Sequence, residues 1–306
     1  MTSTTSPQAI AAKKPVWPVF VGFSVVTTGM MIVSIAAVFL AAVIAAVNGE
    51  SVEFQDEAQL MAWVRSVPWL HIVGVGTSGS LLLVTTLLFV RLEKQTIRLR
   101  LRHHPGPNWP LASVLATIAV LGMGFAMDSL AWMTGAIQSS ALLAFSKFVA
   151  TASTGVYGVL FVLAAGVAPL AEEFFFRGYA QSRLAERWGR WTGILVTASL
   201  FGLLHGDVLH SPMAFLMGLV FGYVAEAFGT LYPAIIAHAV NNATAMLLGR
   251  VMPNDTLSTG TLGALGLAGA LVGAVALAAL VALARRNAPP VEFVPAVDAQ
   301  VGGPGF

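Results

Sequence analysis

Long apolar runs fill most of this chain and decide what it can fold into. A helix that crosses a bilayer needs about 20 predominantly apolar residues, and the chain supplies such runs over nearly its whole length. The composition agrees, because 57% of the 306 residues are hydrophobic and only 10% are charged. A soluble domain with this balance would have too little polar surface to cover itself. The sequence therefore predicts an all-α integral membrane protein, a polytopic transmembrane helix bundle.

Charged and turn-rich breaks divide the apolar sequence into about eight candidate spans. One bundle over residues 15–286 is expected, with disordered tails at 1–14 and 287–306. Residues 128–147 fit either an external interfacial helix or an extension of the third span. Gly269 and Gly273 have the small-xxx-small spacing that lets helices pack closely. The spans fall near residues 17–47, 68–90, 109–127, 148–171, 191–209, 211–228, 231–249 and 262–284.

Clusters of positive charge beside the spans indicate the orientation of the bundle. Lys13 and Lys14 precede the first span, an arginine-rich loop at 91–102 follows the second, and Arg285 and Arg286 follow the last. With eight crossings all three clusters fall on one side, which the positive-inside rule makes the cytoplasm. Both termini are thus expected to be cytoplasmic. The net charge of +2 is explained without a nucleic-acid partner, and the absence of cysteine excludes disulfides and Cys-ligated metals.

A few polar side chains lie inside the apolar runs. Ionisable groups at membrane depth are costly unless they face the bundle interior or water, so each is a candidate for function. The candidates group into three short stretches. These are EEFFFR with Glu172, Glu173 and Arg177, FGLLH with Phe201 and His205, and HAVNN with His238 and Asn242.

Helical periodicity separates the two glutamates of the first stretch. Glu173 and Arg177 are four residues apart, so they share a face and can form an ion pair within one helix. Glu172 is turned by about 100° from Glu173, which leaves it without that partner. An unpaired carboxylate in an apolar pocket suits a general base or acid. The alternative interpretation is that the three charges mark the cytoplasmic end of a span.

The depth of the first two stretches favours a shared site. If the helix with Glu172 ends in a turn at Gly189, Glu172 lies 17 residues before that turn and His205 lies 16 residues after it. Each is then about 25 Å along its helix from the turn, so the two side chains are level across a hairpin. His238 lies only a few residues after the break at 230–233, and it reaches this level only if that turn dips into the bundle.

The three stretches resemble the motifs EExxxR, FxxxH and HxxxN of the CPBP family, the CAAX protease and bacteriocin-processing proteins also called Abi. These are intramembrane proteases related to the CAAX prenyl protease of type two. The resemblance covers residues 148–250, with the motifs in the same order. It implies that the chain hydrolyses a peptide bond near the terminus of a membrane protein or lipidated peptide, within a cell membrane. The Ala-rich, Cys-free composition suggests a bacterial plasma membrane.

The resemblance also implies roles for individual residues. Glu172 with His205 would activate a water, and His238 with Asn242 would stabilise the oxyanion of the tetrahedral intermediate. The remaining motif residues, Glu173, Arg177 and Phe201, would surround this set, with the Glu173–Arg177 pair orienting Glu172.

Metal dependence stays open at this point. Members of the family are often called metallopeptidases, and Glu172, His205 and His238 are candidate zinc ligands that would leave a position open for water. The sequence contains no HExxH, so spacing alone does not establish zinc. Both a glutamate-dependent and a metal-dependent intramembrane protease are therefore hypotheses.

Three alternatives to this kind of protease follow from other features of the sequence. The stretch GTSG at 76–79 resembles the serine motif of rhomboid proteases, with Ser78 as nucleophile, but rhomboids place HxxxN before the serine. A proton-coupled transporter would spread its polar groups along a path, whereas here they cluster at one level. A non-catalytic immunity or scaffold membrane protein is the third alternative, against which the complete motif set argues.

Overall fold

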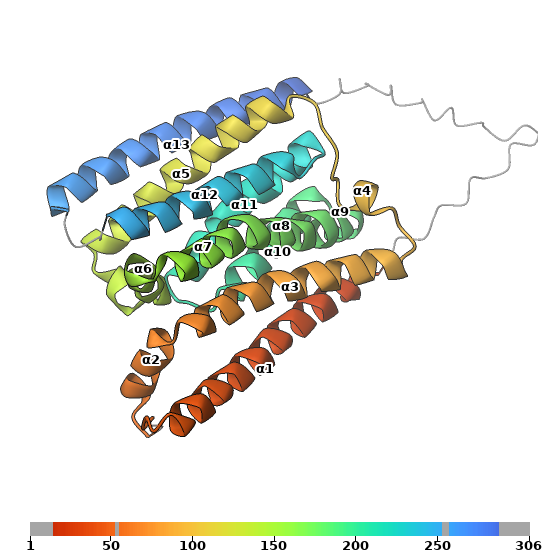
Figure 1. Ribbon diagram of the computed structural model, residues 1–306. Coiled ribbons are helices and arrows are strands. Elements are labelled where there is room, and N and C mark those ends of the chain that lie inside the picture. Colours follow the sequence, from red (N-terminus) through yellow and green to blue (C-terminus); the bar gives the residue numbers. More distant parts are fainter. Residues whose placement is uncertain (1–14, 53–54, 253–256, 288–306) are drawn as a thin grey trace, which may run out of the picture.

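The computed structural model describes residues 15–52, 55–252 and 257–287, and within these ranges it is helical without strands. Figure 1 shows the helices running roughly along one common direction as a bundle. This confirms the predicted all-α polytopic architecture. The tails assigned to 1–14 and 287–306 lie outside the described residues, apart from Asn287 at the end of the last helix.

Each of the eight expected spans overlaps a helix of the described residues, and six helices are long and apolar enough to cross a membrane. Those six are α1, α3, α5, the continuous helix Thr154–Trp188, α11 and α13. Of the other two, α10 has 15 residues and α12 carries the polar HAVNN stretch. The helices are α1 (Trp17–Val47), α2 (Glu57–Ser66), α3 (Pro68–Leu92), α4 (Ile97–Arg100), α5 (Trp109–Met133), η1 (Ala136–Ser139), α6 (Ala141–Thr151), α7 (Thr154–Val162), η2 (Leu163–Val167), α8 (Ala168–Glu173), η3 (Phe174–Gln181), α9 (Ser182–Trp188), α10 (Arg190–Leu204), α11 (His210–Phe228), α12 (Tyr232–Val251) and α13 (Thr259–Asn287).

The helix from α7 to α9 differs from the span expected at 148–171. The chain breaks at Ala152 and Ser153, whose backbones are extended at ψ 145° and 154°, and Ser153 caps the new helix. The helix then runs unbroken to Trp188 and stops at Gly189, whose φ of +91° favours glycine. Two π-helical segments, η2 and η3, interrupt its α-helical hydrogen bonding on either side of α8. The stop at Gly189 was predicted, and the start was not.

Residues 128–147 combine the two arrangements considered for them. α5 extends the third span to Met133, and a separate short helix, α6, begins at Ala141. α13 packs along α5 through glycines. A Cβ on Gly122 would lie 2.5 Å from the carbonyl oxygen of Gly269 and 2.7 Å from Cα of Gly273, so these helices meet backbone to backbone. The close packing predicted from the glycine spacing is confirmed.

One end of the bundle gathers the basic loops. In Figure 1 the end of α3, the short helix α4, the start of α5 and the end of α13 lie at the same end. Arg100 forms an ion pair with Glu186 of α9, and Asn108 before α5 donates to Oδ1 of Asn287 at 2.8 Å. The arginine-rich loop and the last two arginines therefore share one end of the bundle, as the orientation argument requires. The third cluster, Lys13 and Lys14, lies outside the described residues.

The turn before α12 is buried beneath the loop that precedes α5. Thr230 and Leu231 are fully buried. The Thr230 hydroxyl donates to the carbonyl of His104, and the Leu231 amide donates to the carbonyl of Arg102. This turn therefore dips into the bundle, which is the condition that His238 needed in order to reach the level of Glu172.

Candidate active site

The hairpin of α7–α9 and α10 has the register that the sequence predicts. The rings of Phe176 and Phe201 meet edge to face, with centroids 5.3 Å apart. They lie 13 residues before and 12 residues after Gly189. Glu172 and His205 each lie four residues further from the turn, so they are level with one another. Glu172 is also near the middle of the 35-residue helix, well away from either end.

The predicted ion pair between Glu173 and Arg177 is present and fully buried. Nη1 of Arg177 donates to Oε1 of Glu173 at 2.9 Å, and neither side chain is exposed. Nη2 donates to the carbonyl of Gly218 at 3.1 Å. The guanidinium carbon also lies 4.4 Å from the ring centroid of Phe201 and 5.3 Å from that of Phe221. Aromatic faces thus replace water around this cation.

His238 joins the same cluster from α12. Its Nδ1 lies 2.9 Å from Oε1 of Glu173, and because a carboxylate accepts, Nδ1 is the atom that carries hydrogen. Its Nε2 lies 3.6 Å from Oε2 of Glu172. The ring is buried and stacks on Phe221 at 4.9 Å. The contacts of Glu173 thus run to Arg177 and His238, whereas the sequence argument expected Glu173 to orient Glu172.

Charge balance links these four groups. Two carboxylates and one guanidinium leave one uncompensated negative charge in a water-poor interior, which is costly. One proton held by Glu172 or His238 makes the cluster neutral. The distance of 3.6 Å between Glu172 Oε2 and His238 Nε2 is too long for a direct hydrogen bond but close enough for both atoms to act on one small molecule between them.

His205 ends α10 and begins the loop that leads to α11. Its Nδ1 donates to the carbonyl of Phe201 at 2.8 Å, which leaves Nε2 as the acceptor in the neutral ring. Gly206 follows with a φ of +59°, and the ring of His210 lies 4.3 Å from that of His205. Among the described residues the direct polar contact of His205 is with Phe201. The structure therefore brings His205 level with Glu172 without a hydrogen bond between them.

Asn242 lies one turn beyond His238 on α12 and is anchored to a π-helical segment. Its Nδ2 donates to the carbonyl of Ala164 in η2 at 2.9 Å. A π segment departs from the α-helical pattern and makes a carbonyl available to a side chain. Nδ2 of Asn241 donates to Oδ1 of Asn242 at 3.4 Å, so the oxygen of the Asn242 side-chain amide is also held. Sequence reasoning assigned no role to Asn241, although HAVNN offers two adjacent amides.

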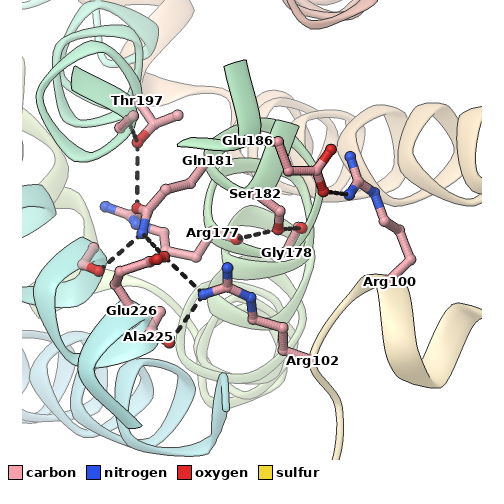
Figure 2. Close-up of polar contacts among 12 residues, drawn as sticks. Arg100, Arg102, Arg177, Gly178, Gln181, Ser182, Glu186, Thr197, Ala225 and Glu226 are labelled. Carbon is pink, nitrogen blue, oxygen red and sulfur yellow. Dashed lines mark hydrogen bonds and ion pairs between the residues drawn. The ribbon is translucent and has the colours of Figure 1, made fainter. Parts of the chain in front are cut away.

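A second buried polar network continues from Arg177 toward the basic end (Figure 2). Gln181 is fully buried, and its Nε2 donates to the carbonyl of Gly222 at 2.9 Å and reaches Glu226 at 3.4 Å. Arg102 donates to the same Glu226 oxygen at 2.8 Å. The Thr197 hydroxyl donates to Oε1 of Gln181 at 3.4 Å. Polar side chains therefore connect the loop before α5 with the helix that carries Glu172.

Sequence reasoning missed this second network, although a signal for it exists. Residues on both helices repeat at intervals of four, so that Arg177 meets Gly218, and Gln181 meets Gly222 and Glu226. The two series are Glu173, Arg177 and Gln181 on the first helix, and Gly218, Gly222 and Glu226 on α11.

An apolar groove borders the site between α7–η2 and α12. It has a volume of about 410 Å³ and lies beside the hydrogen bond between Asn242 and Ala164. Its rim includes Val162 and Val240, which are exposed apolar residues on the outside of the bundle. The groove is lined by Phe161, Val162, Ala165, Gly166, Ala239, Val240 and Ala243.

The fit of a metal can be tested on the same side chains. Within residues 15–52, 55–252 and 257–287 no group of three or more His, Cys, Asp or Glu side chains is arranged to hold a metal ion. Glu172 and His238 face one another, and the hydrogen bonds at Nδ1 of His238 and Nδ1 of His205 leave Nε2 of both rings available, as in metal-binding histidines. The three candidate ligands are not gathered around one point in the described structure, and zinc dependence stays a hypothesis.

One comparison with known proteins gives a match. A family model described as "Type II CAAX prenyl endopeptidase Rce1-like" matches residues 153–244. The matched range contains all three polar stretches, from Glu172 to Asn242. No curated protein and no solved structure matches the chain.

Proposed function

We propose that this member of the CAAX protease family, identified by its match over residues 153–244, cleaves a peptide bond within the membrane by means of a water that Glu172 activates. The observation that carries the proposal is the placement of Glu172. Its carboxylate lies 3.6 Å from the imidazole of His238, level with His205, in a site otherwise closed by apolar rings. A general base must lie close to the water that it deprotonates and must be shielded from bulk water.

The reaction begins with a water held beside Glu172. Glu172 takes one proton as the water oxygen attacks the carbonyl carbon, and the carbonyl electrons move onto its oxygen. The proton then passes to the amide nitrogen, the C–N bond breaks as the carbonyl re-forms, and a carboxylic acid and an amine leave; transfer of the second water proton from the acid to the amine gives carboxylate and ammonium. His205 offers the lone pair of Nε2 to orient the same water, which its level with Glu172 supports.

His238 and Asn242 stabilise the oxyanion of the tetrahedral intermediate. Glu173 accepts the Nδ1 proton of His238, so in the protonated ring Nε2–H is the free donor. Arg177 compensates the charge of Glu173 and keeps that carboxylate in place. One amide hydrogen of Asn242 is donated to the carbonyl of Ala164, and the second is available for the oxyanion. The Glu173–Arg177 pair thus acts mainly through His238.

The substrate is a membrane protein or a lipidated peptide cleaved near its terminus. The apolar groove beside Asn242 supports this, because a segment reaching the site from that flank would meet hydrocarbon side chains. The host membrane is a bacterial plasma membrane with both termini cytoplasmic, which the basic clusters and the composition support.

Membranes containing the wild-type protein or Glu172→Ala provide the first test. We expect peptides from truncated C-termini of membrane proteins in the wild-type sample alone, and one such protein then becomes the cleavage reporter. Glu172→Ala, His205→Ala and His238→Ala should each abolish its cleavage while the variants still insert and fold. Full cleavage by Glu172→Ala refutes the mechanism. Loss of cleavage in Ser78→Ala would favour the rhomboid alternative instead.

The family resemblance also motivates a zinc-dependent version, in which Glu172, His205 and His238 would bind the ion and a bound zinc would lower the pKa of water. The purified protein is assayed with the reporter before and after treatment with a strong chelator, and again after zinc is restored. Unchanged cleavage after chelation eliminates the zinc version. Loss that only zinc restores eliminates the metal-free one.

A further inference from the structure

One carboxylate holds the N-termini of two helices at the outer edge of the site. Asp207 lies in the loop between α10 and α11. Its Oδ2 accepts from the amide of Ala141 at 2.8 Å and its Oδ1 from the hydroxyl of Ser140 at 3.0 Å, both at the start of α6. Oδ1 also accepts from the amides of Leu209 at 3.0 Å and His210 at 2.7 Å, at the start of α11. Negative charge at a helix N-terminus is stabilising, and here it serves two helices at once.

The other end of α6 is held by a cation from α12. Nη1 of Arg250 donates to the carbonyls of Val149 at 3.0 Å, Ala150 at 3.0 Å and Ala152 at 2.7 Å. These are among the carbonyls that a helix C-terminus leaves without partners, and a positive charge complements the dipole there. A single guanidinium nitrogen therefore caps the end of α6.

The two caps come from the two elements that carry the second and third motifs. Asp207 is two residues after His205, in the same loop. Arg250 follows Asn242 by eight residues on the same helix, α12. α6 packs against α12, and in Figure 1 it lies at the end of the bundle away from α4 and α9. The ring of His71 in α3 stacks on the ring of Phe148 in α6, with centroids 3.8 Å apart, so α3 also contacts α6.

We infer that α6 is a strut that sets the distance between the His205 loop and α12, and that Asp207 and Arg250 are positioning residues for hydrolysis. The inference rests on the proposed function. His205 begins a loop that continues through Gly206, and the described structure has no direct hydrogen bond from His205 to Glu172 or His238, so its place depends on what anchors the loop. A misplacement of about 1 Å at a reacting group costs on the order of a hundredfold in rate.

The strut can be tested without any substrate. The chain has no cysteine, so Val208→Cys and Val251→Cys accept a pair of spin labels at sites that are 97% and 67% exposed. One label reports the tip of the His205 loop and the other the end of α12. We expect a narrow distance distribution that broadens in both Asp207→Asn and Arg250→Gln. Unchanged distributions in both variants overturn the strut.

A control, a conservative variant and a substitute variant complete this distance measurement. Asp56→Asn is the matched control, because Asp56 caps the N-terminus of α2 and takes no part in the hydrogen bonds at either end of α6, and it should leave the distribution unchanged. Arg250→Lys should restore most of the narrow distribution, because all three bonds come from one nitrogen and an ammonium group has three donors. If Asp207→Asn does not fold, Ser140→Ala removes one of the two links from α6 to the loop and takes its place.

Turnover of the cleavage reporter tests the positioning role. Asp207→Asn and Arg250→Gln should lower kcat on the order of tenfold to a hundredfold with little change in KM, and Arg250→Lys should recover most of it. Broadened distances with unchanged kcat overturn the positioning role. If Glu172→Ala still cleaves the reporter, the proposed function fails, and the distance measurement alone decides whether α6 is a strut.

Discussion

Glu172 and Glu173 are neighbours in the sequence with opposite surroundings. Glu173 accepts hydrogen bonds from Arg177 and His238 and has no exposure to solvent. Glu172 has no cation within hydrogen-bond distance. Its Oε2 lies 3.6 Å from Nε2 of His238. Burying a carboxylate without a hydrogen-bonding partner lowers stability. Such a loss of stability is common at functional sites.

The two glutamates should therefore respond in opposite ways to loss of charge. Glu173→Gln removes the carboxylate that pairs directly with the fully buried Arg177 and accepts from His238, and should lower the free energy of unfolding by about 3–5 kcal/mol. Glu172→Gln removes an unpaired buried charge, so it should unfold no more easily than wild type while cleaving nothing. Unfolding titrations in detergent measure both. Equal stability of Glu173→Gln and wild type would contradict the assigned ion pair.

At the scale of elements, the π segments explain a contact that an ideal helix would not make. Steps of four residues drift by about 40° around an α-helix. In a π segment the hydrogen bonds run from i to i+5, which turns the same steps back. Arg177 and Gln181 both reach α11, where they donate to the carbonyls of Gly218 and Gly222. The residues EEFFFRGYAQ carry no sequence signal for a π segment. The sequence could therefore predict the Glu173–Arg177 pair but not the polar network around Gln181.

Gly218 makes the contact with α11 possible. A Cβ at this position would lie 3.0 Å from Nη2 of Arg177 and 3.2 Å from the Phe201 ring. Gly218→Ala should displace the guanidinium, cost about 1–3 kcal/mol of stability and reduce cleavage. Gly158→Ala on α7 is the control, since a Cβ there meets nothing within 4 Å. Thermal unfolding and reporter cleavage distinguish the two, and equal behaviour would show that α11 has room to move.

α2 offers a pH-dependent element away from the spans. A hydrogen bond from the backbone amide of Gln59, with a second from its side chain, lowers the pKa of Asp56 below its ordinary value. The cap on α2 is therefore fully present above pH about 4 and is lost as pH falls through the lowered pKa. A spin label at Met61→Cys should become mobile only below that range. In Asp56→Asn its mobility should not change with pH.

Much of the fold follows from residues that the sequence shows directly. Uncharged runs located the helices, and Gly189 located the hairpin that makes Glu172 and His205 level. The break at Ala152 and Ser153 was missed because the sequence on both sides is uncharged, although Thr151, Ser153, Thr154 and Gly155 form the kind of Ser/Thr/Gly cluster that marks a helix start. The contact of His238 with Glu173 depends on a turn held under a loop more than 100 residues earlier in the sequence, and no local pattern reports such a distance.

At the scale of the whole molecule, the basic loops at one end make a testable topology. Thr96 and Arg286 are exposed at that end, and Met61 of α2 lies at the other end. Single cysteines at these positions are unique labels because the chain has none of its own. A membrane-impermeant maleimide should label Met61→Cys on intact cells, and Thr96→Cys and Arg286→Cys only after the membrane is opened. Labelling of all three on intact cells would contradict the orientation.

The shortness of α10 ties the site to the lipid around it. Its 15 residues rise by about 22 Å, whereas the hydrocarbon core of a typical bilayer is about 30 Å thick. Trp191, Leu195 and Leu203 are exposed along this helix, so lipid tails cover it, and it ends at the loop with His205. The membrane must thin on this flank or the loop must lie within it. Acyl-chain length in the host membrane thereby becomes a determinant of how easily water reaches Glu172.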